Sequence, residues 1–164
     1  MKSFLIALFV LLPFVLLPTP LFAESPDNRV AIADLKSVDI ICDVNVGKPD
    51  LLLTRLELID ETYSQLLDAR VTPTIVVAFR GEASRYITRD SLHVPPQQMG
   101  TKKAIRQILE QFQRNGIRLE QCAIAARARH IDPDDLLPGI ALVQNGYVSI
   151  VAYQTRGYAL LPMD

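Results

Sequence analysis

Strand-like and helix-like segments alternate along the chain from residue 38 to residue 161. Residues 38–42 and 74–79 are apolar, β-branched runs. The second run lacks polar alternation, which is typical of a strand covered on both faces. Between these runs, apolar residues recur at the spacing of one helix face: Leu52, Leu56, Ile59, Tyr63 and Leu66. This alternation predicts an α/β domain with a mainly parallel sheet and helices on both of its faces.

The second half of the chain continues the pattern, with one ambiguous segment. We predict a helix over residues 101–116, a strand over 117–121, a short helix over 122–130, and strands over 140–143 and 158–161. The Asn145-Gly146 pair lies between apolar runs, which is a strong hairpin signal. Local sequence chemistry therefore favours a strand over residues 147–153.

Residues 1–23 differ in composition from the rest of the chain. They carry a single charge, at Lys2, and residues 4–17 form an apolar run that is too short to cross a bilayer as a helix. A small residue, Ala23, precedes Glu24, as at a signal-peptide cleavage site. We therefore expect residues 1–23 to be a cleaved secretory signal peptide and the mature protein to be periplasmic. An uncleaved membrane anchor is the alternative.

The remaining residues have the composition of one globular domain. Removing Lys2 with the leader changes the formal charge of the chain from −1 to −2. Such a near-neutral balance argues against an electrostatic surface for nucleic acid. We expect residues 24–37 to be an N-terminal arm and residues 38–164 to form the domain.

Several common functional motifs are absent from the sequence. It has no Gly-rich phosphate loop, no Gly-x-Ser-x-Gly turn and no His-Glu-x-x-His helix. The two cysteines and two histidines lack the paired spacing of a zinc site: Cys42, Cys122, His93 and His130. The sequence therefore predicts neither a metal nor a cofactor, and it disfavours nucleotide-binding and hydrolase functions.

Cys122 is the candidate catalytic residue. It lies where a predicted strand ends and a predicted helix begins, so unpaired backbone N–H groups favour its thiolate, as do Arg127 and Arg129. A solvent-accessible thiolate there is able to act as a nucleophile or to hold sulfane sulfur as a persulfide. Two alternatives stay open. One is a buried, inert cysteine, and the other is a Cys42–Cys122 disulfide, which requires neighbouring strands.

Three further residues are candidate ligand-binding residues because they follow predicted strands. Asn45 follows the strand at 38–42, and Arg80 and Gly81 follow the strand at 74–79. In an open parallel sheet, ligands bind beyond the carboxyl ends of the strands. Arg80 is suited to orient an anion there, and the alternative is that all three are ordinary loop residues.

The C-terminal half contains motifs that resemble a known family. The most specific is the run from Cys122 through an Ala-rich helix to Ile131-Asp-Pro-Asp-Asp-Leu-Leu-Pro138. Gly157-Tyr-Ala-Leu160 follows it, and Val76-Val-Ala-Phe-Arg-Gly81 precedes it. Over residues 38–162 the chain resembles the DsrE/DsrF-like family, and the most specific motif resembles its secreted branch.

The resemblance implies a fold and an assembly. The family fold is a three-layer α/β/α sandwich around a five-stranded parallel sheet, usually assembled as trimers or hexamers. By that resemblance, residues 147–155 form a helix, which overrides the local hairpin signal. Cytoplasmic members include sulfur-relay proteins that carry sulfur on a cysteine at the position that Cys122 matches.

We therefore expect a periplasmic sulfur-relay-like protein in which Cys122 carries sulfane sulfur as a persulfide. Such a protein is a carrier or binding protein rather than a stand-alone enzyme. Its expected partners are other copies of itself and a sulfur-donor or acceptor protein, with no nucleic acid, and with membrane contact only through an uncleaved leader. The alternative is a non-catalytic module that binds a small anion or serves assembly, in which Cys122 is structural or disulfide-bonded.

Overall fold

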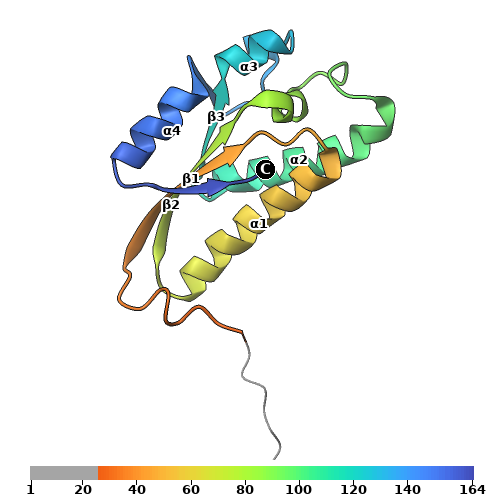
Figure 1. The fold of residues 1–164 in the computed structure, drawn as a ribbon. Coiled ribbons are helices and arrows are strands. Elements are labelled where there is room, and N and C mark those ends of the chain that lie inside the picture. The colour runs from red at the N-terminus through yellow and green to blue at the C-terminus, as the bar shows by residue number, and fades with distance from the viewer. Residues whose placement is uncertain (1–25) are drawn as a thin grey trace, which may run out of the picture.

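Five parallel strands form a single sheet in the order β4-β3-β2-β1-β5 (Figure 1). The computed structural model describes residues 26–164, so the signal peptide predicted over residues 1–23 lies outside the described residues. Residues 26–36 contain turns and neither helix nor strand. The strands are β1 (Ser37–Val44), β2 (Thr72–Phe79), β3 (Arg118–Cys122), β4 (Ile140–Val143) and β5 (Ala159–Pro162).

Helices cover both faces of this sheet, which confirms the predicted α/β class with its three layers. The α-helices are α1 (Pro49–Asp68), α2 (Met99–Arg114), α3 (Ala123–Ala128) and α4 (Gly146–Thr155). The short 3-10 helices are η1 (Gly81–Tyr86), η2 (Pro96–Gln98) and η3 (Pro133–Asp135). Figure 1 shows α1 and α2 along one face and α4 on the opposite face. Within residues 26–164, no helix is both long enough and apolar enough to cross a membrane.

The two faces of the sheet are packed unequally. Side chains alternate between faces along a strand, and Ile40, Cys42 and Val44 of β1 lie in the main core with the buried stripes of α1 and α2. The second cluster, on the face beneath α4, has four buried members: Ile41, Val76, Ala78 and Ile150. The α4 face therefore has much less apolar packing than the α1 and α2 face.

The helix α4 shows that the strand favoured locally for residues 147–153 is wrong, and the helix implied by the family resemblance is confirmed. Asn145 is the N-cap, since its side-chain oxygen accepts a hydrogen bond from the Tyr147 N–H at 3.0 Å. β4 and β5 lie on opposite edges of a parallel sheet, so the chain between them must cross the sheet. A two-residue hairpin joins antiparallel neighbours and cannot make that crossing, whereas a helix can.

Candidate functional site

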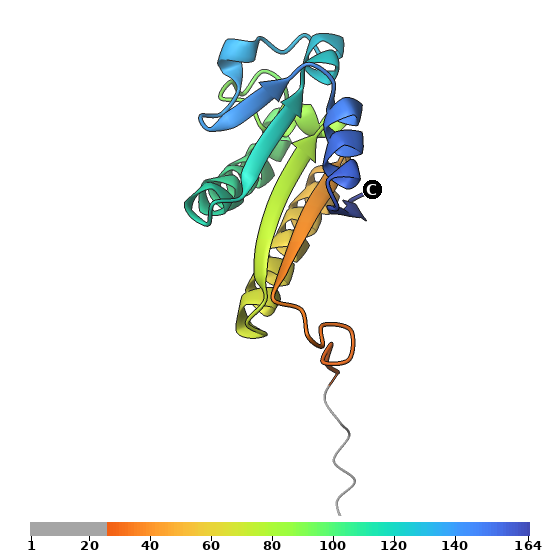
Figure 2. The same cartoon turned by 90° about the vertical axis from the view of Figure 1, so that its left-hand side faces the viewer.

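The candidate site lies at the carboxyl ends of β1, β2 and β3, on the face that α4 covers. Cys42 and Val44 point into the main core, so the side chain of Asp43 between them points to the opposite face, the face of α4. Arg80 directly follows β2 and Cys122 ends β3. Figure 2 shows this end of the strands beside α3, with residues 26–36 at the opposite end of the molecule. The sheet therefore brings Asp43, Arg80 and Cys122 to one edge.

Arg80 is held by a carboxylate and an aromatic ring. Its Nε and one terminal nitrogen donate to the two Asp43 oxygens, each at 2.6 Å, and its other terminal nitrogen donates to the Tyr147 hydroxyl at 2.9 Å. The guanidinium carbon lies 4.6 Å from the centre of the Tyr147 ring. The hydrogen bonds to Asp43 raise the pKa of Arg80 above its usual value, against the opposing effect of burial, and the nearby Cys122 sulfur adds to the increase. Most of the guanidinium is thus engaged within the protein.

Cys122 is a free thiol that is only 4% exposed. Our expectation of a thiol that bulk solvent reaches is therefore wrong. The helix α4 contributes to this burial: a Cβ atom built on Gly146 would lie 3.0 Å from the Cys122 Cβ and 3.6 Å from its sulfur. Only glycine allows the first turn of α4 to approach the cysteine this closely. The amino end of α4, with its partial positive charge, is consequently beside the sulfur.

The Cys122 side chain borders a pocket of about 220 Å³ rather than a sealed apolar core. Polar groups from three segments contribute to the wall. One of these groups is the guanidinium of Arg129. Its buried Nε has no hydrogen-bond partner within residues 26–164, whereas one of its terminal nitrogens pairs with the Glu82 carboxylate at 2.7 Å. The lining residues are Arg80, Gly81, Cys122, Ile124, Ala125, Ala128, Arg129, Asn145 and Tyr147. A few polar side chains therefore border Cys122 in a wall that is otherwise apolar.

The predicted ligand-binding residues are only partly brought together. Arg80 and Gly81 line the pocket, and Asn45 does not. Gly81 has a φ of +59°, and a Cβ there would meet the Asn45 carbonyl oxygen at 3.2 Å. The Asn45 backbone therefore supports the Gly81 turn from outside the pocket.

The structure contradicts a Cys42–Cys122 disulfide. Both thiols are free. β2 separates β1 from β3, and in the register of the sheet Cys42 is level with Val77 and Leu119, three residues before Cys122. Two interstrand spacings of about 4.8 Å already exceed the Cα separation that a disulfide spans. Burial also raises the pKa of the Cys42 thiol to about 12, so this cysteine is unreactive at neutral pH.

Sequence reasoning missed three residues of the site. Asp43 was not among the predicted site residues, although it directly follows Cys42 in an apolar strand. Gly146 and Tyr147 belong to the segment whose Asn-Gly signal was ambiguous between a hairpin and a helix cap. Only the family resemblance pointed to the helix that places them beside Cys122.

A buried carboxylate anchors α4 to the sheet beneath it. Glu120 of β3 is 2% exposed and accepts hydrogen bonds from Ser149 Oγ at 2.7 Å, Tyr153 Oη at 3.0 Å and Arg118 Nε at 2.7 Å. Burial alone opposes its ionisation, but the hydrogen bonds from Ser149, Arg118 and Tyr153 together hold the pKa of Glu120 below its usual value. Glu120 is therefore an ionised, fully hydrogen-bonded group.

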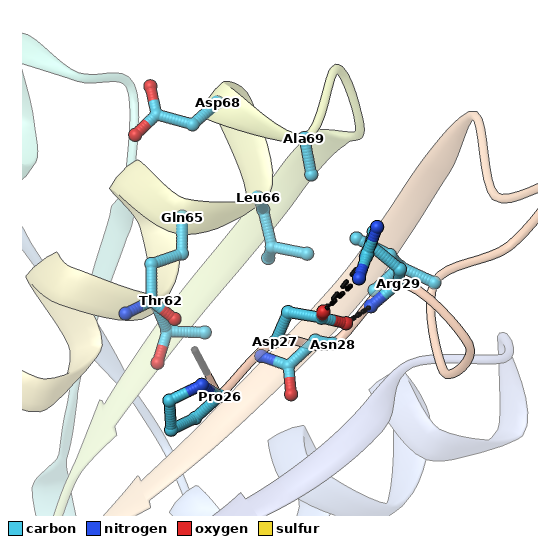
Figure 3. Close-up of a pocket in the computed structure, with 10 residues that line it drawn as sticks. Pro26, Asp27, Asn28, Arg29, Thr62, Gln65, Leu66, Asp68 and Ala69 are labelled. Carbon is cyan, nitrogen blue, oxygen red and sulfur yellow. Dashed lines mark hydrogen bonds and ion pairs between the residues drawn. The ribbon is translucent and has the colours of Figure 1, made fainter. Parts of the chain in front are cut away.

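A larger pocket, of about 570 Å³, lies away from Cys122 (Figure 3). It is open and lies between residues 26–32 and the last turns of α1, at the amino end of the strands. Its polar lining includes Asp27 and Arg29, which form an exposed ion pair with each other at 2.7 Å. No cysteine, histidine or lysine side chain of residues 26–164 lines it. It therefore offers neither the thiol of a sulfur carrier nor an imidazole.

Metal-binding geometry is absent from the part of the chain that the structure describes, since no three His, Cys, Asp or Glu side chains of residues 26–164 form a possible metal site. The polar residues that line the pocket beside Cys122 are Arg80, Arg129, Asn145 and Tyr147, and none of them is a His, Asp or Glu.

Comparisons with known proteins address the family. No curated protein matches the sequence. A solved structure of a protein of unknown function, MTH1491 from Methanobacterium thermoautotrophicum, has the same fold, with a TM-score of 0.62 and 21% identity over 76% of this chain and 98% of that chain. The model of the DsrE/DsrF-like family matches residues 53–163, which include β2, β3 and the candidate site around Cys122. This chain therefore belongs to the DsrE/DsrF-like family.

Proposed function

We propose that this protein is a sulfur-relay carrier that holds sulfane sulfur as a persulfide on Cys122. Family membership supports a sulfur-relay type of function. The observation that carries the proposal is the position of the Cys122 thiol on the wall of a small pocket, next to Arg80 and the amino end of α4. A buried cysteine that only filled space would have apolar neighbours on every side.

The transfer consists of two balanced displacement steps. The Cys122 thiolate attacks the outer sulfur of a donor persulfide, forming a new S–S bond while the donor S–S bond breaks and the donor leaves as a thiolate. An acceptor thiolate then attacks the outer sulfur on Cys122, and Cys122 leaves as a thiolate. One sulfur atom moves in each step, with no net oxidant or reductant. A carrier of this kind needs a nucleophile and a fitted pocket, not a catalytic base.

Positively charged or polarised groups surround the sulfur. The positive end of α4 and the guanidinium of Arg80 both lie near it, and the unpartnered Nε of Arg129 lies in the same pocket wall. A persulfide has a second sulfur atom beyond the first and is more acidic than a thiol. The pocket of about 220 Å³ leaves room for that atom and for the end of a small donor or acceptor group.

The cellular context forms part of the proposal. We propose that residues 1–23 direct the protein to the periplasm and are cleaved, that residues 24–37 form an arm before the domain at 38–164, and that the protein belongs to the secreted branch of its family. We also propose a homo-oligomer, a trimer or hexamer, that exchanges sulfur with a donor or acceptor protein.

The low exposure of Cys122 favours a second candidate function, a non-catalytic module that binds a small anion or serves assembly. In that function the pocket polar groups bind the anion and the thiol stays inert. The engagement of Arg80 by Asp43 counts against it, because the guanidinium has few donors left for an added anion.

The two functions differ in what happens to Cys122 when a polysulfide is added. We expect the purified protein to gain about 32 Da, the mass of one sulfur atom, on the tryptic peptide that contains Cys122. Cys42→Ser should keep the adduct and Cys122→Ser should lose it. A protein that gains no sulfur at Cys122, while a free thiol peptide in the same tube does, would refute the carrier function and leave the binding module.

A further inference from the structure

The helix α4 covers Cys122 with little apolar packing of its own. Of its ten residues, all within the described part of the chain, only Gly146 and Ile150 are buried. Val148 and Val151 point outward and are 64% and 62% exposed. Ile150, with the partly buried Tyr153 packed against the same cluster, makes a small apolar contribution compared with the stripes that hold α1 and α2. Another interaction must therefore hold α4 in place.

That interaction is the Glu120 cluster, which consists of Glu120, Ser149 and Tyr153 with Arg118 beside them. Ser149 and Tyr153 lie one helical turn apart on α4, and both hydroxyls donate to the same buried carboxylate on β3. Hydrogen bonds to a charged acceptor are the stronger kind. Two of them, at adjacent turns, fix both the distance of α4 from the sheet and its rotation.

The same helix places Gly146 against Cys122. Gly146 precedes Ser149 by three residues, so the two lie about one turn apart on the same side of α4. Their α-carbons are joined by a single helical turn, which moves as a unit. A shift of α4 at Ser149 therefore changes the gap between Gly146 and the Cys122 sulfur.

We propose that Glu120 is a positioning residue that, through Ser149 and Tyr153, holds α4 over Cys122 and so controls access to the thiol. The inference deepens the proposed function and rests on Cys122 being the group that reacts there. It adds the regulation of that site: the thiol becomes accessible when α4 moves off the Glu120 cluster, without unfolding of the main core. Sulfur donors and acceptors reach Cys122 from that open state.

The second cysteine, Cys42, is an internal control for global unfolding. Cys42 is fully buried in the main core beneath α1, on the opposite face of the sheet from Cys122. Local movement of α4 exposes Cys122 and leaves Cys42 protected. Global unfolding exposes both thiols together.

The test measures alkylation of both cysteines in the full-length protein by iodoacetamide, with each thiol followed by mass spectrometry of its own peptide. Ser149→Ala and Tyr153→Phe remove one hydrogen bond each and keep the Glu120 charge. Glu120→Gln removes the charge and weakens both bonds. Glu110→Gln is the matched control, because Glu110 is half exposed and pairs with Arg106 on α2.

We expect Glu120→Gln to raise the Cys122 alkylation rate about tenfold, equivalent to about 1.4 kcal/mol in the opening equilibrium. Ser149→Ala and Tyr153→Phe should each raise it about threefold, and these two variants test the inference even where Glu120→Gln folds poorly. The Cys42 rate should stay unchanged in all of them, and Glu110→Gln should change neither rate. The two hydroxyl variants leave the charge of Glu120 in place. A faster Cys122 alkylation in them therefore reports a change in the position of α4 and not a change in the electrostatic field at the thiol.

Two results would overturn the inference. One is a Cys122 rate that stays within about twofold of wild type in both hydroxyl variants, and the other is a parallel rise of the Cys42 and Cys122 rates. Alkylation reports access alone, so the outcome is independent of sulfur transfer. Faster alkylation without a persulfide adduct would refute only the carrier function, and an adduct with unchanged alkylation rates would refute only the role of Glu120.

Discussion

Separating Asp43 from Arg80 is expected to destabilise the protein by more than an ordinary surface ion pair would. The two side chains are 16% and 18% exposed and share two hydrogen bonds of 2.6 Å. Replacing Asp43 by Asn removes the negative charge but keeps the shape of the side chain. It leaves the guanidinium in a partly buried site with two neutral side-chain acceptors, the new amide oxygen and the Tyr147 hydroxyl, in place of the carboxylate.

The magnitude follows from this burial. Exposed ion pairs contribute about 0–1 kcal/mol, and breaking a fully buried pair costs about 3–5 kcal/mol. With both groups mostly buried and joined by two charge-assisted bonds, we expect Asp43→Asn to cost about 2–3 kcal/mol. The coupling energy between Asp43 and Arg80 should be about 1.5–2 kcal/mol.

A double-mutant cycle measures this coupling directly. Asp43→Asn, Arg80→Gln and the double variant are unfolded in urea, and their free energies of unfolding are compared with that of the wild type. The exposed pair of Arg106 and Glu110, at 52% and 50% exposure, provides a matched cycle in which the coupling should be below about 0.5 kcal/mol. An Asp43–Arg80 coupling as small as that of the control pair would show that the pair does not organise the site.

Three further outcomes are expected. Because its folded-state pKa is lowered, Glu120 stabilises the protein above the unfolded pKa of about 4.3, and that contribution disappears as the pH falls through the folded value. The free energy of unfolding, measured in urea between pH 7 and pH 3, should therefore fall less steeply with decreasing pH in Glu120→Gln than in the wild type. Equal slopes in the two proteins would contradict this. Gly146→Ala should destabilise by about 1–3 kcal/mol because the new methyl meets the Cys122 Cβ at 3.0 Å. The matched Gly100→Ala change in α2, with nothing within 4 Å, should be neutral or stabilising in thermal unfolding, and equal effects at both sites would refute the packing argument. Lys102→Met should cost about 1–3 kcal/mol and speed proteolysis after Arg89, because the buried ammonium donates to the Thr88 hydroxyl at 2.6 Å and to the Asp90 carbonyl. Unchanged cleavage would exclude a role for Lys102 in holding this loop.

Regular secondary structure was largely readable from residue patterns because the sheet is buried on both faces. The unbroken apolar run of β2 and the helical stripe of α1 both appear where the patterns predict them. The strand boundaries differ by a residue or two, since strand ends depend on pairing partners. The segment of α4 was misread locally, because Asn145-Gly146 serves a helix cap as well as a hairpin, and its apolar residues do not form a single stripe.

The candidate site was also only partly predictable from residue patterns. The chain order of strands and helices placed Cys122 and Arg80 at one edge, because parallel strands all end on the same side. Residue types also identified Cys122 as the potential nucleophile. Neither pattern revealed that Cys42 points to the opposite face two strands away, since strand order within a sheet is set by long-range packing.

The amino-acid sequence by itself determined most of the elements, the parallel sheet and the choice of Cys122 as the candidate nucleophile, because periodicity and residue chemistry are local properties. Only the tertiary structure decided that α4 covers Cys122, that the Asp43 carboxylate pairs with the Arg80 guanidinium and that Glu120 anchors α4 to β3. These contacts join residues that are 24 to 37 positions apart, and the crossing of the chain over the sheet brings them together. The surroundings of Cys122 are therefore a property of the assembled fold and not of any segment.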